Sequence, residues 1–496
     1  MSDLVKTQAK DGSTVEFIYK DPMQGGVKDV YFAPDKSYVV AFFRKPLEMD
    51  GRERIDKIVG QYRRQIFEEA GGDYWRQIFC WPEKIVEYNG LTGIVVPAYN
   101  KAFFFEDGIQ KGSEKEGKWF ASAKTFNRHV APEEKGDLAK FIRVCLNLSR
   151  GVRRLHMAGL AHSDLSYKNC LVDPKGGNAS IIDIDGLVVP GLYPPDVLGT
   201  PDFIAPEVVA TTGLPKDQRK LPSRQTDLHA LAVLNYLYFF HRHPLRGRKV
   251  WSQDDQEQEK MEMGEKAIFI ENPNDTSNAY DDRDPDDIKR LAPWSNVKKF
   301  SYERMGPYLK ELFEQAFIDG LHNPSRRPSA NDWEDALLKT SDLIQHCANP
   351  NCVNRFFVYC NDAHPVCPCC GTPFKQRFPI LDFYITRDGE KYQPENRRMV
   401  IFDGQSLYLW HVDRMVVANE KLTDEQKTRI GYFQLYKGKW YMRNQTAQDM
   451  KILVENGKSV GRMVQRNEAF ELKEGQQILL KSGPTGRLVN VMFVNK

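Results

Sequence analysis

The chain has 496 residues, of which 41% are hydrophobic and 28% charged, the composition of a soluble globular protein. At about 150 residues per domain, we expect about three domains. No apolar run approaches the roughly 18 residues of a membrane span, and the polar segment from Met1 to Gly12 is no signal peptide. We therefore expect a cytoplasmic protein that does not bind a membrane.

The net charge of +3 is unevenly distributed along the chain. From Lys375 onward there are 21 basic and 14 acidic residues, whereas the preceding part contains 49 basic and 53 acidic ones. The C-terminal quarter is therefore mildly basic, which favours an anionic partner and fits a solvated surface equally well. Nucleic-acid binding is not indicated.

The first hundred residues predict strands with one inserted helix. Apolar, β-rich runs at 27–32 and 38–43 flank a turn. A second hairpin is expected at 85–88 and 92–96, around a turn of Asn and Gly. Between the two hairpins, the segment 52–69 carries apolar residues at helical spacing.

Beyond residue 137 the pattern becomes helical. Further helices are expected at about 226–240, 306–317 and 330–344, and the polar, acidic segment 252–289 is expected to be a loop insertion. From Phe378 the chain predicts about eight to ten short strands with Gly-containing turns. The clearest of these strands lie at 398–402, 407–411, 430–433, 439–444 and 470–480.

The strongest motif runs from His162 to Asp183. His162-Ser163-Asp164 is followed by Asn169, and an apolar strand then ends at Asp183. Phosphoryl transfer needs a carboxylate that orients and deprotonates the attacking hydroxyl, and an amide and a carboxylate that hold the magnesium ion on the phosphates. Asp164 suits the first role, and Asn169 and Asp183 suit the second. The alternative is a surface loop with scattered carboxylates.

The segments after this motif separate two families. Residues 182–185 are similar to the metal motif of small-molecule kinases of the aminoglycoside phosphotransferase type. The segment 199–207, however, resembles the end of a protein-kinase activation segment. Asp227 fits the buried aspartate of the central helix, and Arg327 fits the arginine that pairs with Glu207. The order and spacing of these motifs resemble those of eukaryotic-like (Hanks-type) Ser/Thr protein kinases.

This resemblance implies an α+β bilobal fold that uses ATP and magnesium and acts on a protein substrate. The N-lobe is expected at 1–100 and the C-lobe at 101–345, with the insertion at about 250–290. The implied catalytic residues are Asp164, Lys168, Asn169 and Asp183, the last two as magnesium ligands. The implied nucleotide contacts are Gly25, Gly26, Val27, Lys28, Val30, Ala41, Arg44, Val96, Ala98, Leu171, Asn169 and Asp183.

The N-lobe departs from the pattern of that family. Only two glycines remain in the expected glycine-rich loop, and Phe43 stands where the Val-Ala-x-Lys lysine belongs. Arg44 is favoured over Lys45 as the substitute for that lysine. Its acidic partner on the helix stays open among Glu53, Asp56, Glu68 and Glu69.

The catalytic loop departs as well. Ser163 replaces the arginine before the catalytic aspartate, and Ser166 replaces the lysine after it, so that Lys168 is the nearest substitute. The alternative function is therefore a nucleotide-binding pseudokinase that scaffolds partners. Ser163 carries no positive charge that could bind a phosphorylated loop, and the loop 187–198 contains no Ser or Thr. We therefore expect activity that does not depend on phosphorylation of this loop.

Six of the nine cysteines lie between Cys347 and Cys370. In a reducing compartment such a cluster indicates metal binding rather than disulfides. Four thiolates in two pairs suit tetrahedral, structural zinc, which predicts a zinc ribbon at 346–374. The predicted ligands are Cys347, Cys352, Cys367 and Cys370, and Cys360 or His364 could replace one of them.

The C-terminal segment 375–496 resembles a forkhead-associated (FHA) domain. The run 470–480 is similar to the Leu-x-Asp-Gly-Asp-x-Ile strand pair of that family. The Ser-x-x-His that reads phosphothreonine there is replaced here by 428–431. We therefore expect an FHA-like sandwich with an altered or lost phosphopeptide site, and a plain docking sandwich is an equal alternative.

Further segments resemble one narrower family. They are Cys80-Trp81-Pro82, the run 93–97 and the run 268–273, together with the ribbon and the β-rich tail. They resemble the bacterial kinase of tellurite-resistance (Ter-type) stress clusters. This resemblance implies a role in a stress phosphorylation system, with a von Willebrand A-domain protein and a PP2C-type, metal-dependent protein phosphatase as partners.

Overall fold

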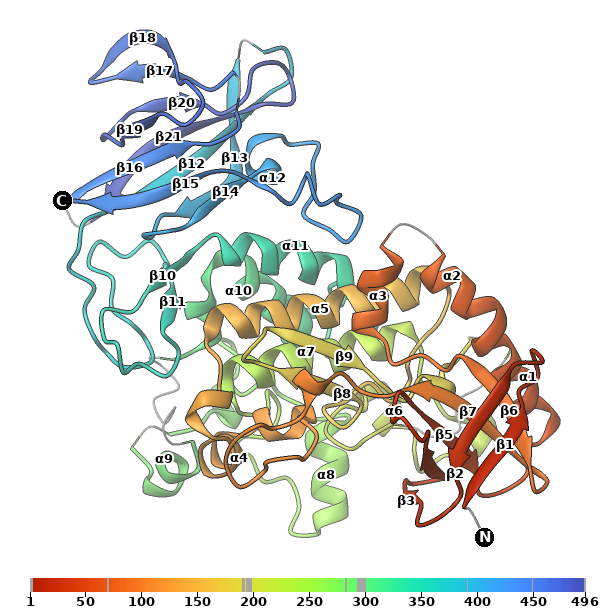
Figure 1. The fold of residues 1–496 in the computed structure, drawn as a ribbon. Coiled ribbons are helices and arrows are strands. Elements are labelled where there is room, and N and C mark those ends of the chain that lie inside the picture. The colour runs from red at the N-terminus through yellow and green to blue at the C-terminus, as the bar shows by residue number, and fades with distance from the viewer. Residues whose placement is uncertain are drawn as a thin grey trace. The chain divides into compact units, whose positions relative to one another are not determined.

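The computed structural model describes residues 3–68, 71–189, 192, 199–281, 283–291, 300–389, 391–447 and 449–494. The chain divides into two compact units (Figure 1). The first comprises Met1–Gly136, Lys140–Lys298 and Glu311–Glu334, and the second comprises Asp137–Ala139, Lys299–Lys310 and Asp335–Lys496. The domain boundaries predicted from the sequence stay predictions. No helix among the described residues is both long and apolar enough to cross a membrane.

The N-terminal part of the first unit contains a five-stranded antiparallel sheet in the order β3-β4-β5-β7-β6. Its strands are β3 (Met23–Gln24), β4 (Lys28–Phe32), β5 (Tyr38–Phe43), β6 (Lys84–Tyr88) and β7 (Leu91–Pro97). Both predicted hairpins are confirmed. A further hairpin, β1 (Leu4–Gln8) with β2 (Thr14–Ile18), was not predicted.

The two faces of this sheet carry different cores, because side chains alternate along a strand. On one face Phe17 of β2 packs with Tyr31, Val40 and Phe42, so the unpredicted hairpin covers this side. On the other face Ala41 packs with residues of the neighbouring strands and of helix α1, namely Ile55, Ile85 and Ile94. Val30, Phe43 and Val96 border this second cluster.

The predicted helix at 52–69 is confirmed, with an irregularity in its middle. It comprises α1 (Met49–Lys57), a π-helical turn (Ile58–Tyr62) and α2 (Arg63–Phe67). Helix α3 (Gly72–Ile78) follows and was not predicted. Its seven residues are too few for a clear helical period, which explains why the pattern missed it.

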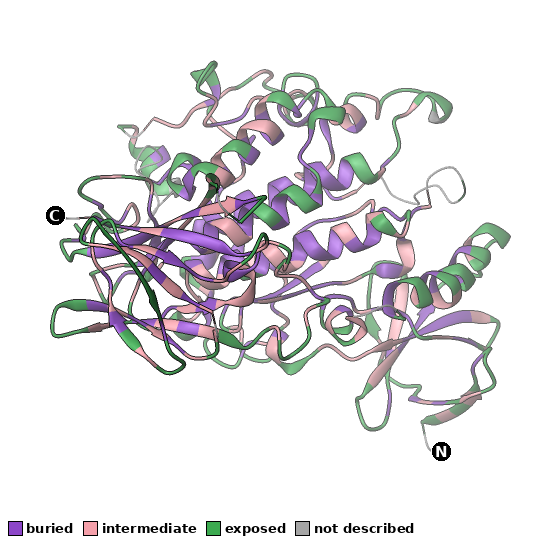
Figure 2. Cartoon of the chain, turned by 90° about the horizontal axis from the view of Figure 1, so that it is seen from above, coloured by how far each residue is buried: buried purple, intermediate pink, exposed green. Residues whose placement is uncertain are grey.

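The helical part of the first unit surrounds the helix α7 (Arg224–Phe240), whose residues from Thr226 to Phe240 are all buried. In Figure 2 the buried colour runs along the long helices of the chain. A short hairpin, β8 (Cys170–Asp173) with β9 (Asn178–Ile181), follows the catalytic loop. Among the described residues, further helices of the chain are α4 (Ala123–His129), α5 (Leu138–Met157), α6 (Pro206–Val209), α8 (Asp255–Met263), α9 (Pro285–Leu291), α10 (Gly306–Glu314) and α11 (Ala330–Ser341). Of these, α5, α10 and α11 contain residues of both units.

The insertion is not the loop that its polar composition predicted. It contains helices α8 and α9, so the expectation of a loop at 252–289 is wrong for these two stretches. Asp254 caps α8 by accepting a hydrogen bond from the backbone N–H of Glu257 at 2.9 Å. At the other end of α8, Glu262 and Met263 are buried. The helix is therefore stabilised by its cap and by the burial of its last turn. Most of its residues are polar, so the sequence shows no apolar helical period.

The first strands of the second unit form a short hairpin, β10 (Ile344–His346) with β11 (Phe356–Val358). Within the described residues, ten further strands form two antiparallel sheets, in the orders β13-β12-β21-β20-β17-β18 and β14-β15-β16-β19. The strands are β12 (Phe378–Thr386), β13 (Tyr392–Val400), β14 (Ser406–Tyr408), β15 (Arg429–Tyr436), β16 (Lys439–Asn444), β17 (Lys451–Glu455), β18 (Lys458–Met463), β19 (Ala469–Glu471), β20 (Gln477–Leu479) and β21 (Arg487–Val494).

One predicted strand of this unit is partly helical. The strand expected at 407–411 ends at Tyr408, and helix α12 (Leu409–Val412) follows it. The ring of His411 turns back to accept a hydrogen bond from the Tyr408 N–H at 3.1 Å, and its other nitrogen lies 3.2 Å from a carboxylate oxygen of Asp342. These tertiary contacts outweigh the strand propensity of the local sequence.

Candidate active site

The carboxylate of Asp227 in α7 holds the start of the catalytic loop, residues 162–169. This carboxylate is 1% exposed and accepts hydrogen bonds from the backbone N–H groups of His162 (2.8 Å) and Ser163 (3.1 Å). His162 also bonds through its ring to the carbonyl of Ile182 at 2.9 Å. The loop is thereby tied to the segment that joins the end of β9, at Ile181, to Asp183.

Asp164 lies in a network of three polar groups. Its Oδ1 accepts a hydrogen bond from the Thr200 hydroxyl at 2.8 Å, and its Oδ2 accepts one from the Asn169 amide at 3.0 Å. The same amide donates to the Asp164 carbonyl at 2.8 Å. The predicted base and the predicted magnesium amide are therefore neighbours. The sequence placed Thr200 in the motif 199–207 but did not predict its hydrogen bond to Asp164, because 36 residues separate the two.

Two residues of the site hold an unusual backbone conformation. Ser163 has φ 66° and Asp183 has φ 60°, in the left-handed region that residues other than glycine seldom occupy. Such strained positions concentrate at functional sites, where the surrounding structure holds them in place. Here the hydrogen bonds of Asp227 hold the first of the two.

Lys28 reaches the carboxylates that follow β9. Its Nζ lies 2.6 Å from an oxygen of Asp185 and 3.2 Å from Oδ1 of Asp183. The side chain of Lys28 is 15% exposed, against 11% for Asp185 and 51% for Asp183. Burial opposes the charge of Lys28, but the attraction of Asp185 and then of Asp183 keeps its pKa above the ordinary value. Asp185 lies in the segment 182–185, and its pairing with Lys28 was not predicted from the sequence.

The other predicted nucleotide contacts divide between the sheet and a cavity. Val30, Ala41 and Val96 share one face of the sheet, where Ala41 belongs to the buried cluster and the two valines border it. Ala98 and Leu171 line a cavity of about 880 Å³. Burial, followed by the charges of nearby acidic residues, raises the pKa of Cys80 in this cavity to about 12, so its thiol stays protonated at neutral pH.

The glycine turn before β4 is held by Arg44. The guanidinium donates to the carbonyls of Gly25 (2.8 Å) and Gly26 (3.2 Å) and to the carboxylate of Asp29 (2.9 Å). The backbone N–H of Gly25 donates to the carbonyl of Lys28 at 2.9 Å, which closes the turn. The predicted contacts of Gly25, Gly26 and Val27 with a nucleotide stay predictions.

The structure describes only some of the remaining predicted residues. Asp56 pairs with Lys10 at 2.6 Å on the surface, and Glu69 lies outside the described residues. Lys168 is exposed, so its predicted catalytic role stays a prediction. Most of the loop 187–198 also lies outside the described residues, which leaves the expectation about its phosphorylation untested.

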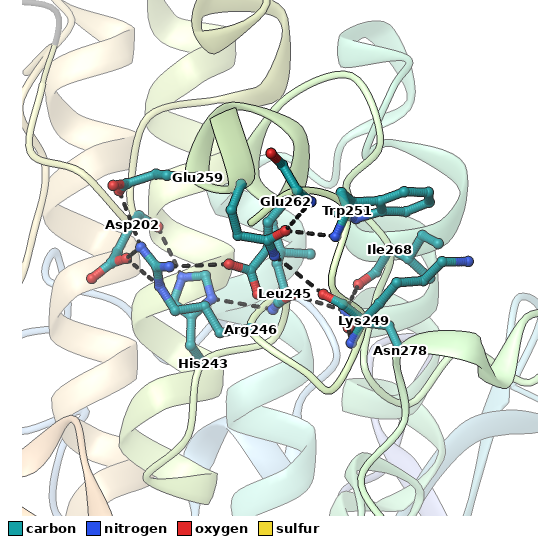
Figure 3. Close-up of polar contacts among 12 residues, drawn as sticks. Asp202, His243, Leu245, Arg246, Lys249, Trp251, Glu259, Glu262, Ile268 and Asn278 are labelled. Atoms are coloured by element: carbon teal, nitrogen blue, oxygen red, sulfur yellow. Dashed lines mark hydrogen bonds and ion pairs between the residues drawn. The ribbon is translucent and has the colours of Figure 1, made fainter. Parts of the chain in front are cut away.

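The end of the activation segment is anchored by two ion pairs. Arg327, whose side chain is 1% exposed, donates to both carboxylate oxygens of Glu207 at 2.8 and 2.7 Å, as the motif predicted. Asp202 accepts a hydrogen bond from Nε of Arg246 at 2.6 Å. The guanidinium of Arg246 is itself held by two carboxylates of helix α8, Glu259 and Glu262, each at 3.2 Å (Figure 3). The insertion is thus linked to the segment.

The half-buried ring of His243 also contacts Asp202. His243 accepts a hydrogen bond from the Leu245 N–H at Nδ1 (3.1 Å), so Nε2 carries the proton that it shares with the carbonyl of Asp202 (2.9 Å). Burial lowers the pKa of His243 to about 4, which keeps the ring neutral at physiological pH. Figure 3 shows this ring beside the ion pair of Asp202.

The second unit contains a separate candidate metal site. The sulfur atoms of Cys347, Cys352, Cys367 and Cys370 all lie within 4.8 Å of one another. The pairs Cys347–Cys370 and Cys352–Cys367 are 3.4 and 3.8 Å apart. Sulfurs at about 2.3 Å from a tetrahedral zinc ion are separated by about 3.8 Å, so the four residues fit the predicted ion. Cys360 instead lies near the carbonyl of Arg304 at 3.6 Å.

Known proteins resemble part of this chain. Residues 119–355 match the family model of the protein kinase domain. The death-associated protein kinase dapk-1 of Caenorhabditis elegans is 31% identical over 123 residues, which cover 24% of this chain and 8% of that protein. The probable serine/threonine-protein kinase RTK1 of Saccharomyces cerevisiae is 29% identical over 154 residues, which cover 29% of this chain and 21% of that protein.

The chain thus spans at most about a fifth of the length of these two curated relatives. The solved kinase domain of the Toxoplasma gondii specific rhoptry antigen has 13% sequence identity and a TM-score of 0.40, and the match covers 69% of this chain and 87% of that one. The family match includes the catalytic loop, the end of the activation segment and the arginine that pairs with Glu207. Residues 119–355, which carry these motifs, are therefore similar to the protein kinase domain.

Proposed function

We propose that this protein transfers the γ-phosphoryl group of ATP to serine or threonine hydroxyls of a protein substrate, with magnesium as the cofactor. The observation that carries the proposal is the arrangement around Asp164, which contacts Asn169 at 3.0 Å and Thr200 at 2.8 Å. Preference for serine and threonine is supported by the name of the yeast relative, a probable serine/threonine-protein kinase.

Each residue of this arrangement has a chemical role. Asp164 orients the substrate hydroxyl and accepts its proton. The Asn169 amide nitrogen is used by Asp164, which leaves the amide oxygen for a metal ion. Asp183 adds a half-exposed carboxylate, and such hard oxygen ligands suit magnesium. The ion neutralises charge on the transferred phosphoryl group when it is bound.

The proposal is tested by phosphate transfer from radiolabelled ATP to a general protein substrate such as casein. Asp164→Asn should lower kcat by about 100- to 10,000-fold, the usual contribution of a positioned base. Asp286→Asn, on the exposed first turn of α9, serves as the matched control and should leave the rate unchanged. Equal rates for wild type and Asp164→Asn would refute the assignment.

The second candidate function is a nucleotide-binding pseudokinase. It is supported by Phe43 at the place of the family's lysine and by Ser166 in the catalytic loop, which is fully buried and carries no charge. Transfer decides between the two functions, because both include nucleotide binding. Binding of magnesium-ATP without measurable transfer in the wild type, under conditions where a known kinase is active, would favour the pseudokinase.

The finer assignment is a cytoplasmic kinase of a bacterial tellurite-resistance type stress system. A zinc ribbon at 346–374 is supported by the spacing of its four sulfurs, and an FHA-like domain is supported by the two antiparallel sheets of the second unit. The partners implied by the resemblance are a von Willebrand A-domain protein and a PP2C-type phosphatase. Co-purification of either protein with the full chain, lost when 375–496 is deleted, tests this assignment.

A further inference from the structure

Strand β5 carries no lysine at the place where protein kinases need one. In that family the lysine of Val-Ala-x-Lys contacts the α- and β-phosphates of ATP and pairs with an acidic residue of a helix. Phe43 stands at this place. Arg44 is the next residue, so strand alternation directs it to the opposite face of the sheet. Its guanidinium is engaged there by Gly25, Gly26 and Asp29.

The register of the neighbouring strand supplies a lysine at the same location. Lys28 of β4 lies directly opposite Phe43 of β5, and Val30 lies opposite Ala41. Side chains that are directly opposite in an antiparallel pair point to the same face, with Cβ atoms about 5 Å apart. The Nζ of Lys28 lies 5.5 Å from the centroid of the Phe43 ring. Lys28 therefore extends along the face on which Ala41 and Val96 lie.

The contacts of the Lys28 ammonium complete the argument. It lies 3.2 Å from Asp183, the proposed metal carboxylate, so the phosphates of a nucleotide bound through that metal would come within its reach. Its closer partner is Asp185, whose two oxygens lie 2.7 and 2.6 Å away. An acidic partner that a kinase helix normally provides is thus present two residues after Asp183. The side chain of Asp185 is 11% exposed, which favours a fixed pair over a solvated one.

We infer that Lys28 is the lysine that binds the nucleotide phosphates, that Asp185 positions it, and that Arg44 braces the glycine turn. This inference rests on the proposed function and deepens it. A lysine moved to the adjacent strand keeps the same charge on the same face, because the two strands are in fixed register. The substitution at Phe43 then does not remove the phosphate-binding cation from the site.

The test compares the binding of ATP and adenosine by the full chain in the presence of magnesium, measured by isothermal titration calorimetry. Lys28→Phe should weaken ATP binding by about 10- to 100-fold, the value of a charge-assisted contact, and leave adenosine binding within about twofold. Lys57 is an exposed residue of α1, and Lys57→Met should change the affinity for neither ATP nor adenosine. Arg44→Met should weaken ATP binding less than Lys28→Phe does.

An exchange variant provides the decisive comparison. Lys28→Phe combined with Phe43→Lys returns the lysine to β5 at the same cross-strand pair, and it should recover most of the ATP affinity. A Lys28→Phe variant that keeps ATP affinity within about twofold of wild type, or a larger selective loss in Arg44→Met, overturns the inference. So does a wild type that binds ATP no more tightly than adenosine. Failure of the proposed kinase function is a distinct result, namely selective ATP binding through Lys28 without phosphate transfer.

Discussion

The ion pair between Glu207 and Arg327 gives a quantitative test of how the activation segment is anchored. Glu207→Gln removes the negative charge and leaves the Arg327 guanidinium, 1% exposed, without a counter-charge. Three backbone carbonyls still accept hydrogen bonds from it, those of Gln225, Gly320 and Leu321 at 2.9, 3.0 and 3.2 Å. The cation therefore remains solvated by carbonyl dipoles but loses its charge partner.

The expected cost follows from burial. Breaking a fully buried pair by removing one partner costs about 3–5 kcal/mol, because the remaining charge is uncompensated. Glu207 is 25% exposed, so solvent screens part of the interaction, and we expect about 2–3 kcal/mol. Glu16→Gln is the matched control. It breaks the pair of Glu16 with Lys6, whose side chains are 35% and 64% exposed, and should cost about 0–1 kcal/mol.

Amide hydrogen exchange is the suitable assay, because a chain with two compact units has no single free energy of unfolding. A loss of about 2–3 kcal/mol corresponds to exchange that is roughly 30- to 140-fold faster. The increase should be confined to the segments around Glu207 and Arg327. Glu207→Gln combined with Arg327→Met should recover part of the protection, since no unpaired charge then remains. Equal exchange in Glu207→Gln and Glu16→Gln would refute the reasoning.

Two further predictions concern metal and pH. The purified chain should contain one zinc ion, which Cys370→Ser should lose and Cys369→Ser should keep, and elemental analysis that finds zinc unchanged in Cys370→Ser would contradict the predicted ligands. Burial lowers the pKa of His241 to about 4, so the unfolded state, with a pKa near 6.5, takes up the proton first as the pH falls. The contribution of the neutral His241 ring to the free energy of unfolding is then fully present above about pH 6.5. It is lost as the pH falls from about 6.5 to about 4, by up to about 3 kcal/mol. His241→Asn, which suits the φ of 52° at this position, should flatten that loss when amide hydrogen exchange of the segment around His241 is compared at pH 7 and 5, after correction for the intrinsic pH dependence of exchange. An unchanged pH dependence would contradict the assignment.

The sequence by itself determined the elements whose chemistry is local. Asp164 and Asn169 are five residues apart in one loop, so spacing alone predicted that they would meet, and the structure places them in contact at 3.0 Å. The four cysteines were likewise recognised as two close pairs, and their sulfurs gather within 4.8 Å. The pair of Glu207 with Arg327, 120 residues apart, was predicted only because both lie in recognisable motifs.

Only the tertiary structure decided which cation accompanies the acidic residues of the site. Alternation along β5 shows that Phe43 and Arg44 face opposite sides, but it cannot say which residue of β4 lies opposite Phe43. That pairing depends on register, and the ion pair of Lys28 with Asp185 joins residues 157 positions apart. The same reason applies to helix α8, whose link to Asp202 runs through Arg246. Contacts between distant segments leave no period in the local sequence, and so they appear only once the chain is folded.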